Sequence, residues 1–273
     1  MEKLSAEEQL DQLTSYLDAH YEEPDFTPPW KGGAGDPQPA DNYCAKLPDR
    51  ISHAAMLVLG SAVDHSMPGV AYTREVETRE LAELGAVQFT GPNPDGARWV
   101  IALHSGGWWR GSGQALEMQW RPEVAAVAQL SGAIVVDVDY PLAPEYTVAE
   151  MHAAVERAID YARGEGARTV TVWGYSSGAA LAALSADRAD ELVLTYPDFG
   201  ALDALPDELR AGFELSARLP RTLLQVATHD EVADTPELLA AELTTREYVS
   251  RHRVSTPEVA RQRVKDIADY LRL

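Results

Sequence analysis

The chain has 273 residues, 45% of them hydrophobic and 24% charged, with a net charge of −20 and an isoelectric point near 4.6. It is long enough to bury one large core, and its acidity disfavours nucleic acid and anionic membranes as partners because both repel a negative surface. A single cysteine, Cys44, excludes an internal disulfide framework, no Cys/His cluster has zinc-ligand spacing, and no apolar run resembles a signal peptide or a membrane span, so we expect a cytoplasmic protein.

The N-terminal stretch is predicted to be helical and amphipathic. Ser5 and Glu8 have the spacing of a capping box, and leucines recur after them at helical intervals. A connector rich in Pro and Gly follows from Pro24 to Pro39, and a second helix is predicted over Asp49–Ala62. The pattern fits an arm packed on the body as well as a cap over a substrate pocket.

From about residue 85 the pattern becomes an alternation of strands and helices. We therefore divide the chain into an N-terminal helical cap or arm, residues 1–80, and a core, residues 81–273. Continuous apolar strands separated by helices predict an α/β fold with a mostly parallel sheet covered on both faces. The predicted strands are Trp99–Leu103, Ala133–Val138, Thr169–Trp173, Glu191–Thr195, Thr222–Ala227 and Glu247–Val249. The predicted helices are Pro122–Leu130, Val148–Arg163, Ser177–Ala186, Pro236–Leu243 and Pro257–Leu271.

A Gly-Gly loop follows the first of these strands, in the run His104-Ser-Gly-Gly-Trp-Trp109. Glycines leaving a strand can turn their backbone N–H groups outward, and such pairs of donors are what a tetrahedral oxyanion requires. Taken alone, the run also fits a glycine-rich turn with His104 and the tryptophans as packing residues. A later segment, Asp137–Glu145, contains prolines that stop a strand and begin a well-defined loop.

The most informative stretch is G-x-S-x-G at Gly174–Gly178, between a predicted strand and a helix-forming run. In this context the serine, Ser176, is held on a strained turn with its hydroxyl exposed, and the helix behind it directs N–H groups at the same place. A lone G-x-S-x-G also fits an ordinary strand-to-helix turn, so the prediction of a nucleophile depends on the neighbouring motifs.

Together these motifs resemble those of the α/β hydrolases, and in particular the group of esterases that contains hormone-sensitive lipase and kynurenine formamidase. The H-[GS]-G-G-W loop, the D-Y-x-L-A-P-E segment and the G-x-S-x-G elbow occur in that group's order and at similar separations. The resemblance covers residues 85–273 and implies the α/β-hydrolase fold with a variable N-terminal helical cap.

The resemblance also implies a triad in the order Ser, Asp, His. Asp230 follows a strand where the group places its acid, and His252 lies between the last strand and the terminal helix, where the group places its base. Glu231 and Asp198 are alternative acids. The short spacing between Asp230 and His252 predicts a small intervening helix.

The predicted oxyanion hole consists of the N–H groups of Gly106, Gly107 and Ser177, the residue after the nucleophile. Trp108, Trp109 and Tyr175 are assigned to substrate binding, although tryptophans at such a turn more often serve as packing. Arg110 either binds a substrate carboxylate or is a solvated surface residue. Ser105 replaces the glycine common in the group's loop, and the group's usual aspartate before the serine is here Tyr175.

We therefore expect a serine hydrolase that cleaves carboxylic esters of small or medium molecules through an acyl-enzyme, with no cofactor and no metal. The alternatives are an amidase such as an arylformamidase, or a ligand-binding protein that has kept the fold without the chemistry. Convergence of Trp108, Trp109 and Arg110 on the serine would favour the arylformamidase. The expected partner is a small ester or amide, and the sequence leaves homodimerisation open.

Overall fold

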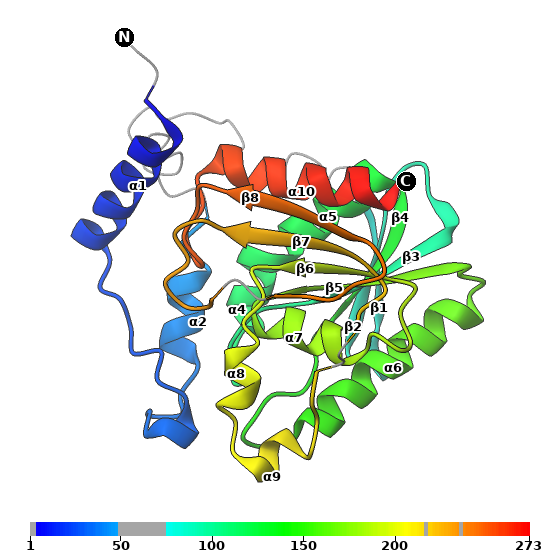
Figure 1. Ribbon diagram of the computed structural model, residues 1–273, viewed down its shortest axis with the longest axis horizontal. Helices are drawn as coiled ribbons and strands as arrows, with labels where there is room; N and C mark the ends of the chain where they lie inside the picture. Colours follow the sequence, from blue (N-terminus) through cyan, green and yellow to red (C-terminus); the bar gives the residue numbers. More distant parts are fainter. Residues whose placement is uncertain (1–3, 49–74, 216–217, 235–236) are drawn as a thin grey trace.

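The computed structural model describes residues 4–48, 75–215, 218–234 and 237–273. One eight-stranded sheet forms its centre, in the order β1-β2-β4-β3-β5-β6-β7-β8 (Figure 1). The pairs β1–β2 and β2–β4 are antiparallel, and all the other neighbours are parallel. The predicted mostly parallel sheet is therefore confirmed.

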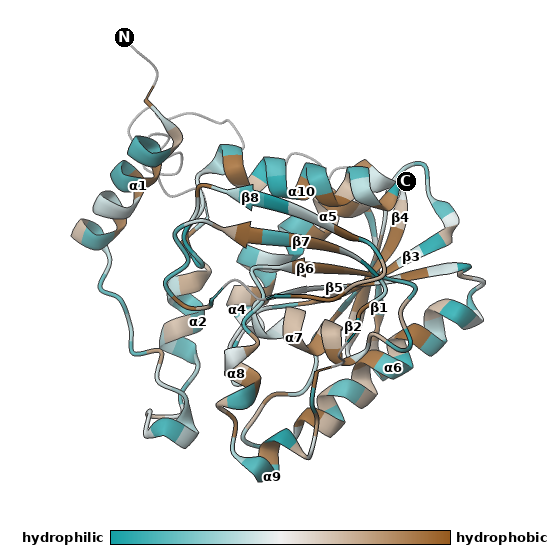
Figure 2. Ribbon diagram, viewed as in Figure 1, coloured by the Kyte–Doolittle hydropathy of each residue, from teal (hydrophilic) through white to brown (hydrophobic). Residues whose placement is uncertain are grey.

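The six predicted strands all belong to this sheet. The apolar runs of five of them, β3 to β7, occupy its interior, where a strand is covered on both faces and needs no polar alternation. Their bounds are β3 Asp95–Leu103, β4 Ala133–Val138, β5 Thr169–Tyr175, β6 Glu191–Thr195, β7 Arg221–Ala227 and β8 Leu243–Tyr248. The edge strand β8 is mostly exposed and polar (Figure 2), which discourages pairing with another sheet.

Two antiparallel strands at the opposite edge were not predicted. β1 is Glu77–Leu81 and β2 is Ala86–Thr90. β1 is polar and largely exposed, so its sequence lacks the apolar pattern of a buried strand. It also includes residue 81, at which the sequence analysis divides the chain, and that division into two parts stays a prediction.

Helices cover both faces of the sheet (Figure 1). α6 and α7 lie on one face, and α5 and α10 lie on the other. The alternation within β5 serves both layers: Val172 packs with α6 and α7, whereas Trp173 packs with α5 and α10. The helical bounds are α5 Arg121–Ser131, α6 Val148–Gly164, α7 Ser177–Leu184 and α10 Pro257–Leu271.

Shorter elements connect these layers. A π-helical turn, Leu116–Trp120, leads into α5. The other short elements are 3-10 turns at Pro29–Lys31 and Ala82–Leu84 and the helices α4 Gly113–Ala115, α8 Gly200–Asp203 and α9 Asp207–Arg210.

One predicted helix is wrong and another lies outside the described residues. Residues 237–242 are not helical, and β8 begins at Leu243, so the helix expected over Pro236–Leu243 is absent from its described part. The described residues of the connection from β7 to β8 therefore contain no helix, which explains the short spacing between the candidate acid and base. The helix expected over Asp49–Ala62 lies outside the described residues.

The N-terminal segment forms a small layer of its own. α1 spans Ala6–His20 and begins with the predicted capping box between Ser5 and Glu8. α2, Gln38–Cys44, was not predicted, because it begins within the proline-rich connector. A separate apolar cluster joins these helices to the body through Ala115 and Val254.

Candidate active site

The turn between β5 and α7 has the strained geometry expected of the elbow. Ser176 has φ 57° and ψ −120°, in a region that residues with a side chain rarely adopt. A Cβ on Gly174 would lie 2.0 Å from the carbonyl oxygen of Gly178, and one on Gly178 would lie 2.3 Å from that of His104. The two glycines are therefore needed so that β5, α7 and the loop after β3 can approach one another.

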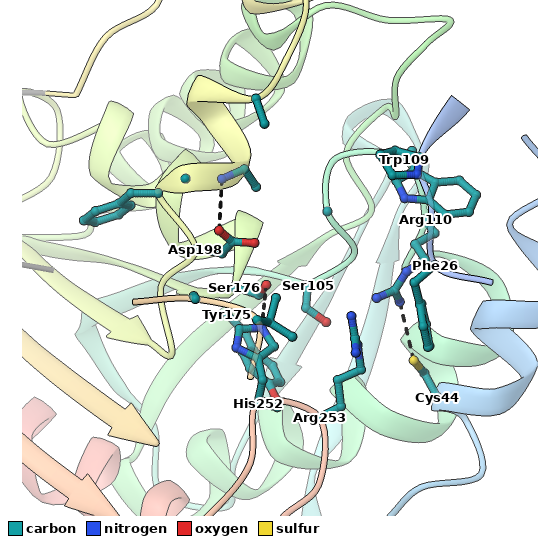
Figure 3. Close-up of a pocket in the computed structure, with 18 of the residues that line it drawn as sticks. Phe26, Cys44, Ser105, Trp109, Arg110, Tyr175, Ser176, Asp198, His252 and Arg253 are labelled. Atoms are coloured by element: carbon teal, nitrogen blue, oxygen red, sulfur yellow. Dashed lines mark hydrogen bonds between the residues drawn. The ribbon is translucent and has the colours of Figure 1, made fainter. Parts of the chain in front are cut away.

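Three side chains from three different loops form one hydrogen-bonded chain at the carboxyl ends of the sheet strands, and Figure 3 shows two of them, Ser176 and His252. The Nε2 atom of His252 lies 2.8 Å from the Oγ atom of Ser176, and its Nδ1 atom lies 2.8 Å from the Oδ2 atom of Asp230. The structure thus brings together the three residues predicted as nucleophile, base and acid. With Nδ1–H donating to the carboxylate, Nε2 is left to accept the serine hydroxyl proton.

The two oxygens of Asp230 have separate partners. Oδ2 faces His252, while Oδ1 accepts the backbone N–H groups of Val232 and Ala233 at 2.9 and 2.8 Å. Burial alone would raise the pKa of Asp230, but the hydrogen bonds and the charge of His252 outweigh it and lower that pKa below its usual range. The carboxylate therefore stays ionised and fixed in orientation at neutral pH.

Two further residues hold the backbone of His252. The Glu231 carboxylate accepts its N–H at 3.1 Å, and the Tyr175 hydroxyl donates to its carbonyl oxygen. Glu231, an alternative acid in the sequence analysis, is thus bonded to the peptide rather than to the imidazole. No sequence signal could reveal either contact, because each joins loops that meet only in the folded chain.

The loop after β3 presents the predicted oxyanion donors. Gly106 has φ 145°, and a Cβ there would lie 1.7 Å from the carbonyl oxygen of Arg110. Within the described part of the chain, the N–H groups of Gly106 and Gly107 have no backbone or side-chain acceptor. Ser177 is the first residue of α7, so its N–H has no acceptor within the helix. Of the three residues, Gly107 lines the cavity at Ser176, whereas Ser177 is fully buried.

The Asp137–Glu145 segment supports this loop from behind. The Tyr140 ring stacks on His104 at 4.2 Å, and its hydroxyl donates to the His104 carbonyl oxygen at 2.8 Å. The N–H of Ala143 donates to the carbonyl oxygen of Trp108 at 2.9 Å. The sequence predicted only a defined loop here, and the fold shows that it fixes the loop after β3.

A cavity of about 480 Å³ opens onto Ser176 and His252. Trp109 and Tyr175, two of the residues predicted to bind substrate, line it, and Ser105 lies beside the serine (Figure 3). Trp108 differs from its assignment. It is fully buried in the core with residues of α6, has a φ of 75°, and does not line the cavity.

Arg110 is not a solvated surface residue. It is 8% exposed, lines the cavity, donates to the Cys44 Sγ atom at 3.4 Å and lies 3.9 Å from Asp41. Phe26 and Arg253 line the same wall of the cavity. The sequence analysis did not single out either residue, since nothing in their local pattern distinguishes them.

Other acids and histidines are not part of the hydrogen-bonded chain. Asp198 lines the cavity but caps α8, accepting the Ala201 N–H at 2.9 Å, and burial raises its pKa. His229 is exposed, next to Asp230. Among the residues that the structure describes, no three His, Cys, Asp or Glu side chains are grouped so that they could hold a metal ion.

Comparison of the chain with protein-family models and with solved structures agrees with this architecture. Residues 100–206 match the model of a family described as having the alpha/beta hydrolase fold. Together with the strand order and the elbow, this places the chain among proteins of the α/β-hydrolase fold. No curated protein matches the chain.

Several solved esterase structures superpose on the chain. An esterase from the bacterial hormone-sensitive lipase family has a TM-score of 0.61 at 15% identity, covering 100% of this chain and 99% of its own. An arylesterase has a TM-score of 0.62 at 17% identity, covering 98% of each. An esterase of Pyrobaculum calidifontis has a TM-score of 0.56 at 20% identity, covering 84% of this chain and 92% of its own. The predicted fold, and the resemblance in fold to this group, are confirmed.

None of the helices within the described ranges is both long and apolar enough to cross a lipid bilayer.

Proposed function

We propose that the protein is a serine hydrolase that cleaves carboxylic esters of small or medium molecules. The observation that carries this proposal is the continuous chain from Ser176 Oγ through His252 to Asp230, open to a cavity on the serine side. The esterases among the superposed structures support the same reaction class.

In the proposed reaction Ser176 attacks the ester carbonyl carbon while His252 Nε2 takes the hydroxyl proton. The carbonyl oxygen becomes an oxyanion facing the N–H groups of Gly106, Gly107 and Ser177. His252 then gives the proton to the departing alcohol oxygen, which leaves an acyl-enzyme. A water molecule, deprotonated by the same imidazole, releases the acid and regenerates the serine. Asp230 stays ionised throughout and stabilises the imidazolium.

An ester is favoured over an N-formyl aryl amide. The arylformamidase alternative calls for Trp108, Trp109 and Arg110 to converge on the serine, and Trp108 is instead buried in the core. The ligand-binding alternative explains neither the strained serine nor its hydrogen bond to an imidazole.

A fluorophosphonate probe, which phosphonylates only an activated serine, tests the proposal. We expect stoichiometric labelling of the wild type at Ser176, located by peptide mass spectrometry, and no labelling of Ser176→Ala. Ser105→Ala is the matched control, since Ser105 also lines the cavity but has no histidine partner, and it should still be labelled. Labelling at another serine, or none, would contradict the assignment.

Turnover of p-nitrophenyl esters of increasing acyl length then defines the reaction. We expect hydrolysis of short and medium acyl chains, with an initial burst if release of the acyl group is slow. A labelled protein that hydrolyses none of these esters but cleaves aryl formamides would favour the amidase.

A further inference from the structure

One wall of the cavity is basic, although the protein is strongly acidic. Arg110 and Arg253 line it, and the exposed Lys31 also lines the cavity, in a chain with 43 acidic and 23 basic residues. Such a cluster is not expected from the composition, and a low-dielectric cleft lined by one sign of charge concentrates ligands of the opposite sign.

The two arginines are held together by an aromatic ring. The Cζ atom of Arg110 lies 4.7 Å from the centroid of Phe26, and that of Arg253 lies 4.0 Å from it. The ring face attracts both cations, so two like charges that would otherwise separate share one wall in a fixed arrangement. Figure 3 shows Arg253 beside Ser105, with Arg110 and Phe26 further along the same side.

Their positive charge is only partly compensated. Asp41 lies 3.9 Å from Arg110, and although burial raises the pKa of this acid to about 6, it stays mostly ionised at neutral pH and offsets the Arg110 charge. Glu23 lies 3.8 Å from Arg253, but its side chain is 64% exposed, so solvent screens the pair. In the described part of the chain the Nε atom of Arg253 is buried and has no hydrogen-bond acceptor.

The acidic residues of the cavity lie elsewhere. In Figure 3 Asp198 is on the opposite side of Ser176 from the two arginines, and its carboxylate accepts the N–H of Ala201. Asp234, which also lines the cavity, is exposed. The cavity is therefore polarised, with its positive end at Arg110 and Arg253.

We propose that the preferred ester carries a carboxylate, which Arg253 and Arg110 bind while the ester carbonyl lies at Ser176. The proposal rests on the proposed function and specifies its substrate class. A planar carboxylate matches the paired donors of a guanidinium, and both arginines line the cavity. Because Arg253 directly follows His252, the bound anion also lies close to the reacting centre.

Pairs of esters that differ only in charge test this proposal. On the acyl side we use the mono-p-nitrophenyl ester of glutaric acid and the corresponding neutral glutaramic ester. On the alcohol side we use p-acetoxybenzoate and p-acetoxybenzamide. We expect the wild type to show a higher kcat/KM for the charged member of one pair, and that pair identifies the side of the ester that carries the anion.

Substitutions then locate the source of the preference. Arg253→Gln should reduce the charged-to-neutral ratio of kcat/KM by about tenfold or more, since a hydrogen bond to a charged group is lost. Arg110→Lys keeps the charge but not the paired donors, and should reduce the ratio less. Arg251→Gln is the matched control: it removes the same charge on the other side of His252, outside the cavity lining, and should leave the ratio unchanged.

Binding without turnover separates this inference from the proposed reaction. Ketone analogues, in which a methylene replaces the ester oxygen, are titrated calorimetrically into the wild type and the three variants. Tighter binding of the charged ketone, lost in Arg253→Gln but not in Arg251→Gln, supports the anion site even if no ester is hydrolysed. Equal binding and equal kcat/KM for both members of each pair, or a preference that Arg253→Gln does not alter, would overturn it.

Discussion

The carboxyl ends of the sheet strands and the N-terminal segment contribute to the same cavity in different ways. The carboxyl ends of the parallel strands supply Ser176, Asp230 and His252 from the loops after β5, β7 and β8, and hydrogen bonds of 2.8 Å join the three side chains. The N-terminal segment supplies Phe26 from its connector and the partners of Arg110 from α2, and it has a small apolar cluster of its own. Substitutions at the carboxyl ends of the strands should therefore abolish ester hydrolysis, whereas substitutions in the N-terminal segment should alter which ester is preferred.

The largest effect is expected at the serine. Ser176→Ala should lower kcat for a short ester by about 10⁵-fold or more, because the attacking oxygen is absent, without changing the fold. Steady-state kinetics with p-nitrophenyl acetate and a circular dichroism spectrum measure both. Turnover near the wild-type rate would mean that another group attacks the ester.

A comparison of two histidines tests the base. His252→Ala should cost nearly as much as loss of the serine, because Ser176 Oγ then has no proton acceptor. His229→Ala, an exposed position beside Asp230, should retain most of the wild-type kcat. The opposite ranking, measured on the same ester, would transfer the role of base to the loop after β7.

Three neighbouring acids should differ in a graded way. Asp230→Asn should lower kcat by about 10⁴-fold with little change in KM, because the amide allows the wrong imidazole tautomer. Glu231→Gln should cost far less, since its oxygen can still accept the His252 N–H. Asp198→Asn should be mild because its carboxylate caps α8. If Asp198→Asn were the severe variant, the acid assignment would be wrong.

Two leucines, one in each region, sharpen the comparison. Leu17→Ala leaves a cavity in the N-terminal cluster, where it should loosen Phe26 and change KM for long acyl chains more than kcat for acetate. Leu192→Ala leaves a cavity in the central sheet and should lower the melting temperature of the whole protein, at a cost of about 2–5 kcal/mol. Kinetics and calorimetry on both variants give the test. An unchanged chain-length preference in Leu17→Ala would mean that the segment only packs on the body.

The smallest effect concerns the pH dependence of stability. The pKa of Asp41 is raised from 3.8 to about 6, chiefly by burial, so between these values the folded protein binds more protons than the unfolded chain. This acid therefore makes the free energy of unfolding decrease as pH rises through that window. Asp41→Asn should make the free energy of unfolding depend less on pH in that window, while its side-chain oxygen still accepts the Gly111 N–H.

Denaturant unfolding of the wild type and of Asp41→Asn at several pH values between 4 and 7 gives the difference between their free energies of unfolding. Buried Asp137, whose pKa is also raised to about 6, contributes a slope of the same sign to both proteins and cancels in the subtraction. If the free energies of unfolding of the two proteins change with pH by the same amount, Asp41 does not titrate in this range.

The body of the fold and the candidate nucleophile Ser176 were predictable from the local sequence pattern, whereas Asp230 and His252 were predicted from the resemblance to a known family, with Glu231 and Asp198 as alternative acids. Buried parallel strands read as continuous apolar runs, and the glycines around Ser176 are required by local backbone geometry, so both leave a mark in the sequence. The helix expected at Pro236–Leu243 was wrong because the loop there is held by contacts with the neighbouring chain segments, which local propensity does not report. Only the tertiary structure decided that Trp108 turns into the core, that Glu231 holds the His252 peptide, and that Arg253 and Arg110 meet on Phe26. Each of these depends on segments far apart in the chain, where packing outweighs local pattern.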